Sequence, residues 1–142
     1  MRYGYCIFCD DIRTELGEKL SFMGVYNGVL LLPEFPYTLP KLCAQINLVT
    51  PTNLPYRSIV LECFSPGEDQ PLLRENLDTV QLDEQEQMSV VAGEQTPDVV
   101  VGASLVFSPL RIRRPGFLSI RAVIDDEPVE ISSLRIAKHH DH

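Results

Sequence analysis

The stretch KLCAQINLVTPTNLPYRSIVLECF, residues 41–64, decides the fold class. Over residues 41–49 apolar and polar side chains alternate, which is typical of a strand with one buried face. Two prolines and an asparagine then predict a turn, and residues 58–64 carry the apolar side chains of a second strand. The alternation predicts that Cys43 lies on the more polar face and that Cys63 packs among apolar neighbours as a small hydrophobic residue.

The segments before this stretch also favour strands. Asn27-Gly28 tolerates positive φ at both positions, so it predicts a two-residue hairpin between strands at 19–26 and 29–33. Residues 10–20 are the only candidate helix, but they contain a glycine and are short. We therefore expect the N-terminal third to be mainly extended chain.

The same pattern continues to the C-terminus. Residues 99–112 predict one long strand that bends at Gly102 or Pro109. Residues 117–124 and 129–137 predict a closing hairpin across the acidic sequence between them.

The middle of the chain is acidic. From Glu62 to Asp98 there are ten acidic residues and one basic residue, Arg74. Residues 76–82 and 87–92 predict strands within this segment. We expect a solvated acidic surface, with an acidic docking face for a partner as the alternative.

Together these segments predict an all-β fold. We expect a single antiparallel β-sandwich of about seven to nine strands, immunoglobulin-like or C2-like. This domain would span residues 1–138, and residues 139–142, which hold all three histidines, would form a disordered His-rich tail. The predicted body therefore contains no imidazole for acid–base catalysis or metal binding.

Composition excludes several classes of function. The chain has 142 residues and a net charge of −8, so we expect neither nucleic acid nor an anionic membrane as a partner. No apolar run reaches the length of a membrane span, and the N-terminus lacks the features of a signal peptide. We expect a cytoplasmic protein with reduced cysteines and no cofactor.

The first two cysteines form a C-x-x-C pair, Cys6 and Cys9. Their odd spacing places them on opposite faces of a strand, and two aspartates follow that would raise the thiol pKa. A zinc site would need all four cysteines to converge, including Cys43 and Cys63. Structural thiols are the favoured interpretation, with metal binding and redox chemistry as alternatives.

Three groups of carboxylates could serve as ligands. Asp10-Asp11 and Asp125-Asp126 lie at predicted strand ends, and Glu68-Asp69 lies in a loop. Calcium binds such carboxylates when loops bring them together, so Asp10, Asp11, Asp125 and Asp126 are the metal candidates. The other interpretation is that aspartates simply favour turns.

Two charged sets are candidate binding residues. In an extended chain Asp11, Arg13 and Glu15 share one face, where the arginine could bind a carboxylate substrate with an acid beside it for acid–base chemistry, or where the charges could form a local ion pair. Near the C-terminus, Arg111, Arg113 and Arg121 could lie on one outer face of a sheet, as in protein interfaces and anion sites. The candidate binding residues are Asp11, Arg13, Glu15, Lys19, Arg111, Arg113 and Arg121.

The N-terminal third resembles the front of a family of small bacterial proteins whose domain has no known function. The resembling residues are Asp10, Asp11, Ile12, Arg13, Glu15, Gly17 and Lys19, then Gly24 and Tyr26, then residues 33–42. This resemblance implies a bacterial or phage-related cytoplasmic protein. It implies no reaction, substrate or cofactor, and the cysteine pair is not part of the family pattern.

These observations favour a non-enzymatic β-sandwich that binds a protein partner or associates with itself as a homodimer. The alternative is a sandwich that binds a cation or a small ligand through loop carboxylates. A hydrolase or lyase that uses carboxylates is the third hypothesis.

Overall fold

The computed structural model describes residues 2–77 and 98–140, and this part of the chain contains eleven strands and no helix. In chain order they are β1 Tyr3–Thr14, β2 Leu20–Val25, β3 Val29–Leu32, β4 Tyr37–Leu39, β5 Leu42–Pro51, β6 Ile59–Phe64, β7 Leu73–Asn76, β8 Asp98–Phe107, β9 Leu110–Ile112, β10 Gly116–Ile124 and β11 Glu127–Lys138. The all-β prediction is confirmed. The strands outnumber the predicted range partly because β4 and β9 contain only three residues each, too few for a sequence pattern to reveal.

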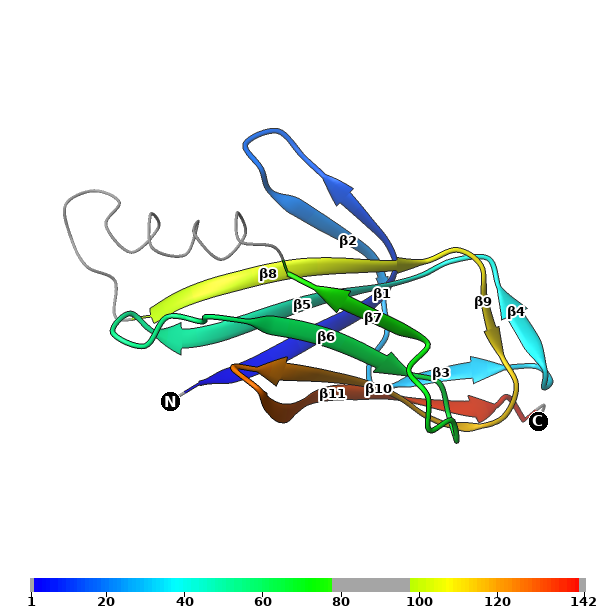
Figure 1. Cartoon of the computed structure of the whole chain (residues 1–142). Helices are drawn as coiled ribbons and strands as arrows, with labels where there is room; N and C mark the ends of the chain where they lie inside the picture. Colours follow the sequence, from blue (N-terminus) through cyan, green and yellow to red (C-terminus); the bar gives the residue numbers. More distant parts are fainter. Residues whose placement is uncertain (1, 78–97, 141–142) are drawn as a thin grey trace.

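Two larger sheets face each other and enclose one core (Figure 1). The first sheet has the order β2-β1-β5-β8, and the second has the order β3-β11-β10-β6-β7. Ile46 of β5 and Ile120 of β10 are both fully buried, so apolar side chains from the two sheets meet between them. The short strands β4 and β9 pair with each other at one end of these layers.

Strand β5, which covers most of the half-buried strand predicted at residues 41–49, is buried on both faces and not on one. It lies between β1 and β8, and its Cys43 and Gln45 are 0% and 5% exposed. The Ser104 hydroxyl donates a hydrogen bond to the Gln45 side chain, whose Nε2 donates to Asn47 Oδ1 at 3.4 Å. Cys43 does share the more polar face with Gln45 and Asn47, but the expectation of a half-buried strand is wrong, because that face is buried too and its polar side chains bind one another. Cys63 is fully buried in the core, as predicted.

The predicted Asn27-Gly28 hairpin is also wrong. β2 belongs to the first sheet and β3 to the second, so the chain crosses between the layers at this point. Gly28 has a φ of 92°, which suits a crossing as well as a hairpin turn. β3 then pairs with β11 in parallel, so the fold is not purely antiparallel.

The actual hairpin lies one strand earlier, in the segment that was the candidate helix. β1 continues to Thr14 and turns back into β2, and the Glu15 amide donates to the Lys19 carbonyl at 2.7 Å. Gly17 and Glu18 have φ values of 82° and 61°, so this turn relies on left-handed backbone that a helix excludes.

Residues 10–25 form a projecting hairpin, which we call the arm (Figure 1). β1 pairs with β5 from Tyr3 to Cys9, and from there to Thr14 only its pairing with β2 continues. The arm therefore extends beyond the body of the first sheet, where both of its faces meet solvent over much of their area.

The C-terminal predictions agree better with the structure. The long strand predicted at residues 99–112 divides at Ser108-Pro109 into β8 and β9, which lie in different sheets. β10 and β11 form the predicted closing hairpin, and both residues of its turn, Asp125 and Asp126, have positive φ.

Part of the sequence predictions falls outside the described residues. The strand predicted at 87–92 lies there entirely, and so do most of the strand predicted at 76–82 and five of the ten acidic residues of the expected acidic surface. The last two residues of the predicted tail lie there as well. Within the described part of that tail, the His139 amide donates to the Leu32 carbonyl at 2.7 Å, which extends the pairing of β11 with β3.

Candidate functional site

A groove of about 380 Å³ opens between the β6–β7 loop and the chain that runs from the end of β8 through β9. Its apolar wall is formed by Leu72, Leu73, Phe107, Pro109 and Leu110. Ser65 and Gln70 add neutral polar groups. Leu72 is 44% exposed, so the groove presents apolar surface directly to solvent.

Two of the predicted binding residues, Arg111 and Arg113, line this groove. The alternation of β9 places them there, because Leu110 and Ile112 turn into the core and are 2% and 0% exposed. Arg111 also lies opposite Thr38 of β4, which fixes the position of its backbone. The arginines therefore stand on a paired strand and its immediate extension.

The charges of the groove do not cancel. Glu68, the acidic residue of its lining, is bound by Arg114, with Nη2 3.3 Å from Oε1. The Arg114 side chain passes so close to Gly67 that a Cβ there would lie 2.9 Å from its Cδ. Within residues 2–77 and 98–140, neither Arg111 nor Arg113 makes an ion pair. Among the described residues, the groove thus keeps two positive charges without an ion-pair partner, on a protein of net charge −8.

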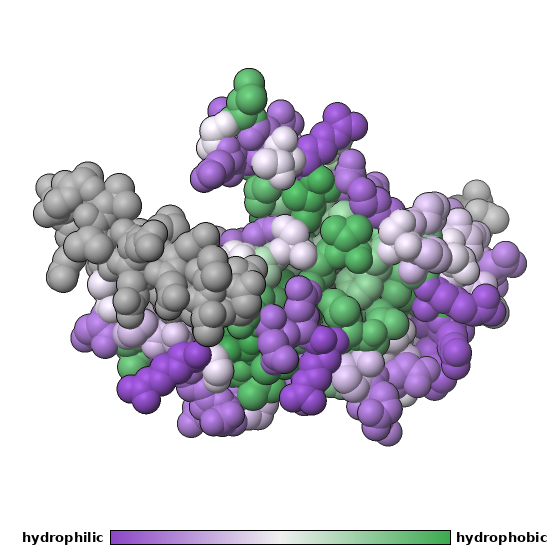
Figure 2. Space-filling view, turned by 45° about the horizontal axis from the view of Figure 1, so that its top comes forward, coloured by the Kyte–Doolittle hydropathy of each residue, from purple (hydrophilic) through white to green (hydrophobic). Residues whose placement is uncertain are grey.

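Figure 2 shows hydrophobic residues gathered in the middle of one face, below the projecting arm and bordered by hydrophilic residues. Apolar surface that is framed by polar residues is typical of protein and ligand binding sites. An arginine beside apolar surface can bind a carboxylate with two parallel hydrogen bonds, so the groove is chemically suited to an acidic and partly apolar ligand.

Arg121 is not part of the groove. It lies opposite Glu62 in the register of β10 with β6, and its Nη2 is 2.8 Å from Glu62 Oε1. Its guanidinium also lies 4.8 Å from the centre of the Phe64 ring. Arg74 approaches the other Glu62 oxygen at 3.9 Å. Arg121 therefore neutralises a carboxylate that is 8% exposed, and the three predicted arginines do not share one site.

The N-terminal candidates lie on the arm and do not surround a pocket. Asp11 Oδ1 accepts a hydrogen bond from Lys41 Nζ at 2.6 Å, and Arg13 Nε lies 3.6 Å from Asp11 Oδ2. The Lys41 hydrogen bond holds the pKa of Asp11 below its ordinary value. Glu15 and Lys19 bound the exposed turn. Asp11 thus has the local ion pair that was one of the two interpretations of this set.

Residues of the family-like pattern meet at the base of the arm. The Tyr26 hydroxyl donates a hydrogen bond to Asp10, and a Cβ at Gly24 would collide with the same carboxylate. Burial and the hydrogen bond to Asp10 raise the pKa of the Tyr26 phenol. These three residues fix the place where the arm leaves the body, so this part of the pattern has an architectural role.

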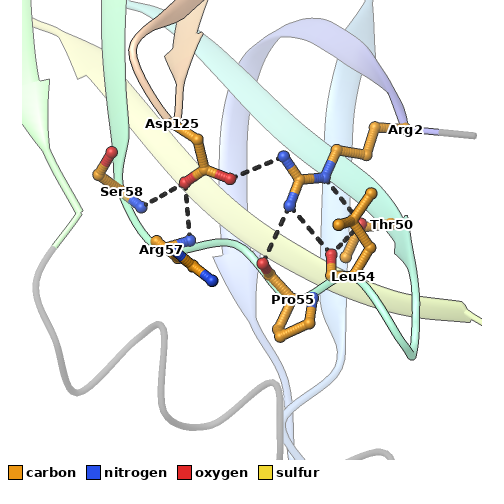
Figure 3. Close-up of polar contacts among 7 residues, drawn as sticks. All are labelled: Arg2, Thr50, Leu54, Pro55, Arg57, Ser58 and Asp125. Atoms are coloured by element: carbon orange, nitrogen blue, oxygen red, sulfur yellow. Dashed lines mark hydrogen bonds and ion pairs between the residues drawn. The ribbon is translucent and has the colours of Figure 1, made fainter.

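The carboxylate of Asp125 is fully occupied by protein groups (Figure 3). Its Oδ1 accepts hydrogen bonds from the amides of Arg57 and Ser58, both at 2.8 Å, and its Oδ2 binds Arg2 Nη1 at 2.7 Å. Arg2 also donates to Thr50 Oγ1 and to the carbonyls of two loop residues. The network joins the start of β1, the β5–β6 loop and the β10–β11 turn.

The metal candidates do not come together. Asp125 and Asp126 lie beside the first residues of the chain, whereas Asp10 and Asp11 lie toward the far end of β1, roughly 25 Å away by strand geometry. In the described ranges no three His, Cys, Asp or Glu side chains form a group that could hold a metal ion.

The cysteines separate into two pairs, and Cys6 is the one thiol of the four that is only partly buried. Cys9 lies opposite Cys43 in the register of β1 with β5, and both are 0% exposed. Cys6 packs against the core, where burial and the nearby Cys63 raise the pKa of its thiol to about 12. The C-x-x-C residues therefore point to opposite sides of β1, as their spacing predicts, and all four thiols are free.

Comparison with known proteins assigns the chain to a family. A family of unknown function, DUF6941, matches residues 4–137. The chain belongs to DUF6941. This confirms the resemblance drawn from the N-terminal residues. Searches of curated proteins and of solved structures found no match. Within the described ranges, this DUF6941 chain has no helix that is long and apolar enough to cross a membrane.

Most of the groove of this DUF6941 chain was not found from sequence. Leu72 and Glu68 come from an irregular loop, and Phe107 comes from the end of a long strand. They meet only because β6–β7 and β8–β9 lie beside each other in the folded chain. The two arginines were found because arginines gather in the last predicted strands, although the outer face that they were expected to share with Arg121 does not form.

Proposed function

We propose that this protein is a non-enzymatic interaction module that binds an acidic, partly apolar protein segment in the groove beside β9. The observation that carries the proposal is the pairing of an apolar wall with Arg111 and Arg113, whose charges no described residue neutralises. A carboxylate on the ligand would find two guanidinium groups, and an apolar side chain next to it would cover Leu72 and Phe107.

Two observations support binding over catalysis. The groove holds one carboxylate, Glu68, and that carboxylate is bound by Arg114. Among the described residues the thiols with the largest pKa shifts, Cys6 and Cys63, have pKa values raised by burial, the direction opposite to that of a nucleophile. The four free cysteines also support our proposal of a reducing, cytoplasmic location.

The proposal is tested with a fluorescein-labelled peptide of alternating leucine and glutamate, and with a matched peptide of leucine and lysine. Fluorescence anisotropy should show binding of the acidic peptide alone, weakened as salt rises from about 50 to 500 mM. The Arg111→Glu/Arg113→Glu variant should bind at least about tenfold more weakly.

The matched control is Arg135→Glu/Lys138→Glu, which makes the same change of net charge on exposed positions of β11. It should retain wild-type binding of the acidic peptide. Equal weakening by the control and the groove variant would show that net charge alone attracts the peptide, and would contradict the proposal. Equal binding of the two peptides would contradict it as well.

A further inference from the structure

We propose that the groove is occupied by the arm tip of a second copy of this chain. In this arrangement Leu16 of one copy enters the apolar part of the groove of its neighbour, and Glu15 and Glu18 lie beside Arg111 and Arg113. The inference rests on the proposed function of the groove and adds the identity of its ligand.

The side chains of the arm tip complement those of the groove in polarity and in charge. Leu16 is 93% exposed, the highest value among the large hydrophobic residues that are described. Glu15 and Glu18 flank it, and both are exposed. The tip therefore presents an apolar side chain between two carboxylates, with the exposed Lys19 following Glu18, and its apolar and acidic groups match an apolar wall beside two arginines.

The conformation of the tip is fixed before any contact is made. The Glu15 amide binds the Lys19 carbonyl, and Gly17 and Glu18 hold left-handed backbone angles. At its base, the hydrogen bond of Tyr26 with Asp10 anchors the arm to the body. A ligand that is held in its bound shape loses little conformational entropy on binding, which favours even a small contact.

The occupant must come from another molecule. An exposure of 93% for Leu16 shows that the tip does not contact the groove of its own chain. Figure 1 shows the arm projecting away from both sheets, so its end is open to a neighbouring molecule.

The contact joins two different surfaces, so each copy offers one arm and one groove. Two copies that exchange arms would form a closed symmetric dimer. Copies that bind head to tail, each with its arm in the groove of the next, would form rings or open chains. A reciprocal dimer has two such contacts, and the second forms within an existing complex at high effective concentration.

The test is sedimentation velocity of the full chain at about 10 to 500 μM in about 50 mM salt. Wild type should show a sedimentation coefficient that rises with concentration and falls back toward the monomer at about 500 mM salt. Glu15→Arg/Glu18→Arg should stay monomeric even though it brings the net charge of −8 closer to zero. Leu16→Ser should also stay monomeric, and it should fold normally because the side chain is exposed.

The decisive measurement mixes two charge-reversed variants. Arg111→Glu/Arg113→Glu should be monomeric alone, but an equimolar mixture with Glu15→Arg/Glu18→Arg should associate, because each arm then meets a groove of opposite charge. Arg135→Glu/Lys138→Glu should associate like wild type. A wild type that remains monomeric at about 500 μM, or a mixture that fails to associate, would overturn the inference.

Failure of the inference can be separated from failure of the proposed function. The acidic peptide is titrated into Leu16→Ser, whose groove no arm would occupy. Binding of the peptide with a monomeric wild type would overturn the arm contact and leave the groove as a binding site for another protein. Absence of both peptide binding and association would overturn both proposals.

Discussion

Arg2 binds Asp125 across 123 positions of sequence, with Nη1 2.7 Å from Oδ2. The pair fixes the N-terminus of β1, in the first sheet, to the turn between β10 and β11, in the second sheet. The Arg2 guanidinium also lies 4.9 Å from the centre of the Tyr56 ring, and it donates to Thr50. One side chain thus joins the two layers at the end of the fold opposite the arm.

Arg2→Ala should lower the free energy of unfolding by about 2 kcal/mol, because it removes charged hydrogen bonds at a partly buried site. Urea denaturation at neutral pH measures the change. Arg135→Ala, on an exposed position of β11, should have an effect below about 0.5 kcal/mol. A loss of similar size in the two variants would show that the network contributes nothing specific.

The Asp125 carboxylate should also make stability depend on pH. Burial alone would raise its pKa, but hydrogen bonds from Ser58, Arg2 and Arg57 hold it below the ordinary value of 3.8. Because the folded pKa is the lower one, the stabilisation is complete above about pH 4 and is lost as the pH falls through the folded value.

Asp125→Asn should therefore unfold more easily than wild type at neutral pH, and the difference should shrink below pH 3.8. Urea denaturation of both proteins across the acid range tests this. A difference that stays constant down to about pH 2 would show that shape, and not charge, makes Asp125 stabilising.

Local patterns predict the strands of this protein better than their placement in sheets. The closing hairpin was predicted because it depends on residues adjacent in sequence, whereas the strand predicted to bend at Gly102 or Pro109 is in fact divided before Pro109 into two strands. The Asn27-Gly28 turn was misassigned because positive φ serves a crossing between sheets as well as a hairpin. The sequence of the turn does not determine whether the strand after it pairs with the strand before it or joins the other sheet.

The groove shows the same limit at the level of the site. Arg111 and Arg113 stand out in the sequence because arginines gather in the last predicted strands, and the structure then places them beside the buried residues of β9. Leu72 carries no such signal, since it becomes part of a wall only when β6–β7 lies against β8–β9. Asp125 was proposed as a metal candidate for a related reason. Its ion-pair partner is Arg2, and no sequence pattern connects two residues so far apart in the chain.

A third prediction concerns the buried carboxylate of Glu62. Arg121→Ala should lower the free energy of unfolding by about 3 kcal/mol, because Glu62 is 8% exposed and would lose its close partner. Arg74→Ala should cost less than about 1 kcal/mol, since Arg74 lies 3.9 Å away and is 64% exposed.

Urea denaturation of the two single variants and of Glu62→Gln/Arg121→Ala measures the effect. The double variant should be more stable than Arg121→Ala alone, because a neutral amide is easier to bury than an unpaired carboxylate. If Arg74→Ala and Arg121→Ala were equally destabilising, the assignment of Arg121 as the main partner of Glu62 would be wrong.

The last prediction concerns the thiols. Burial raises the pKa of Cys63 to about 12, and burial together with the neighbouring Cys63 and Cys9 does the same for Cys6. At pH 8 only about one such thiol in ten thousand is ionised, against about one in ten for an ordinary thiol with a pKa of 9.0. Burial also raises the pKa of Cys9 and Cys43.

All four thiols should therefore react slowly with a disulfide reagent in the native protein and rapidly in guanidinium. Zinc released together with the thiols, at one equivalent per chain, would contradict the assignment of the cysteines as packing residues, because it would require them to converge on a metal.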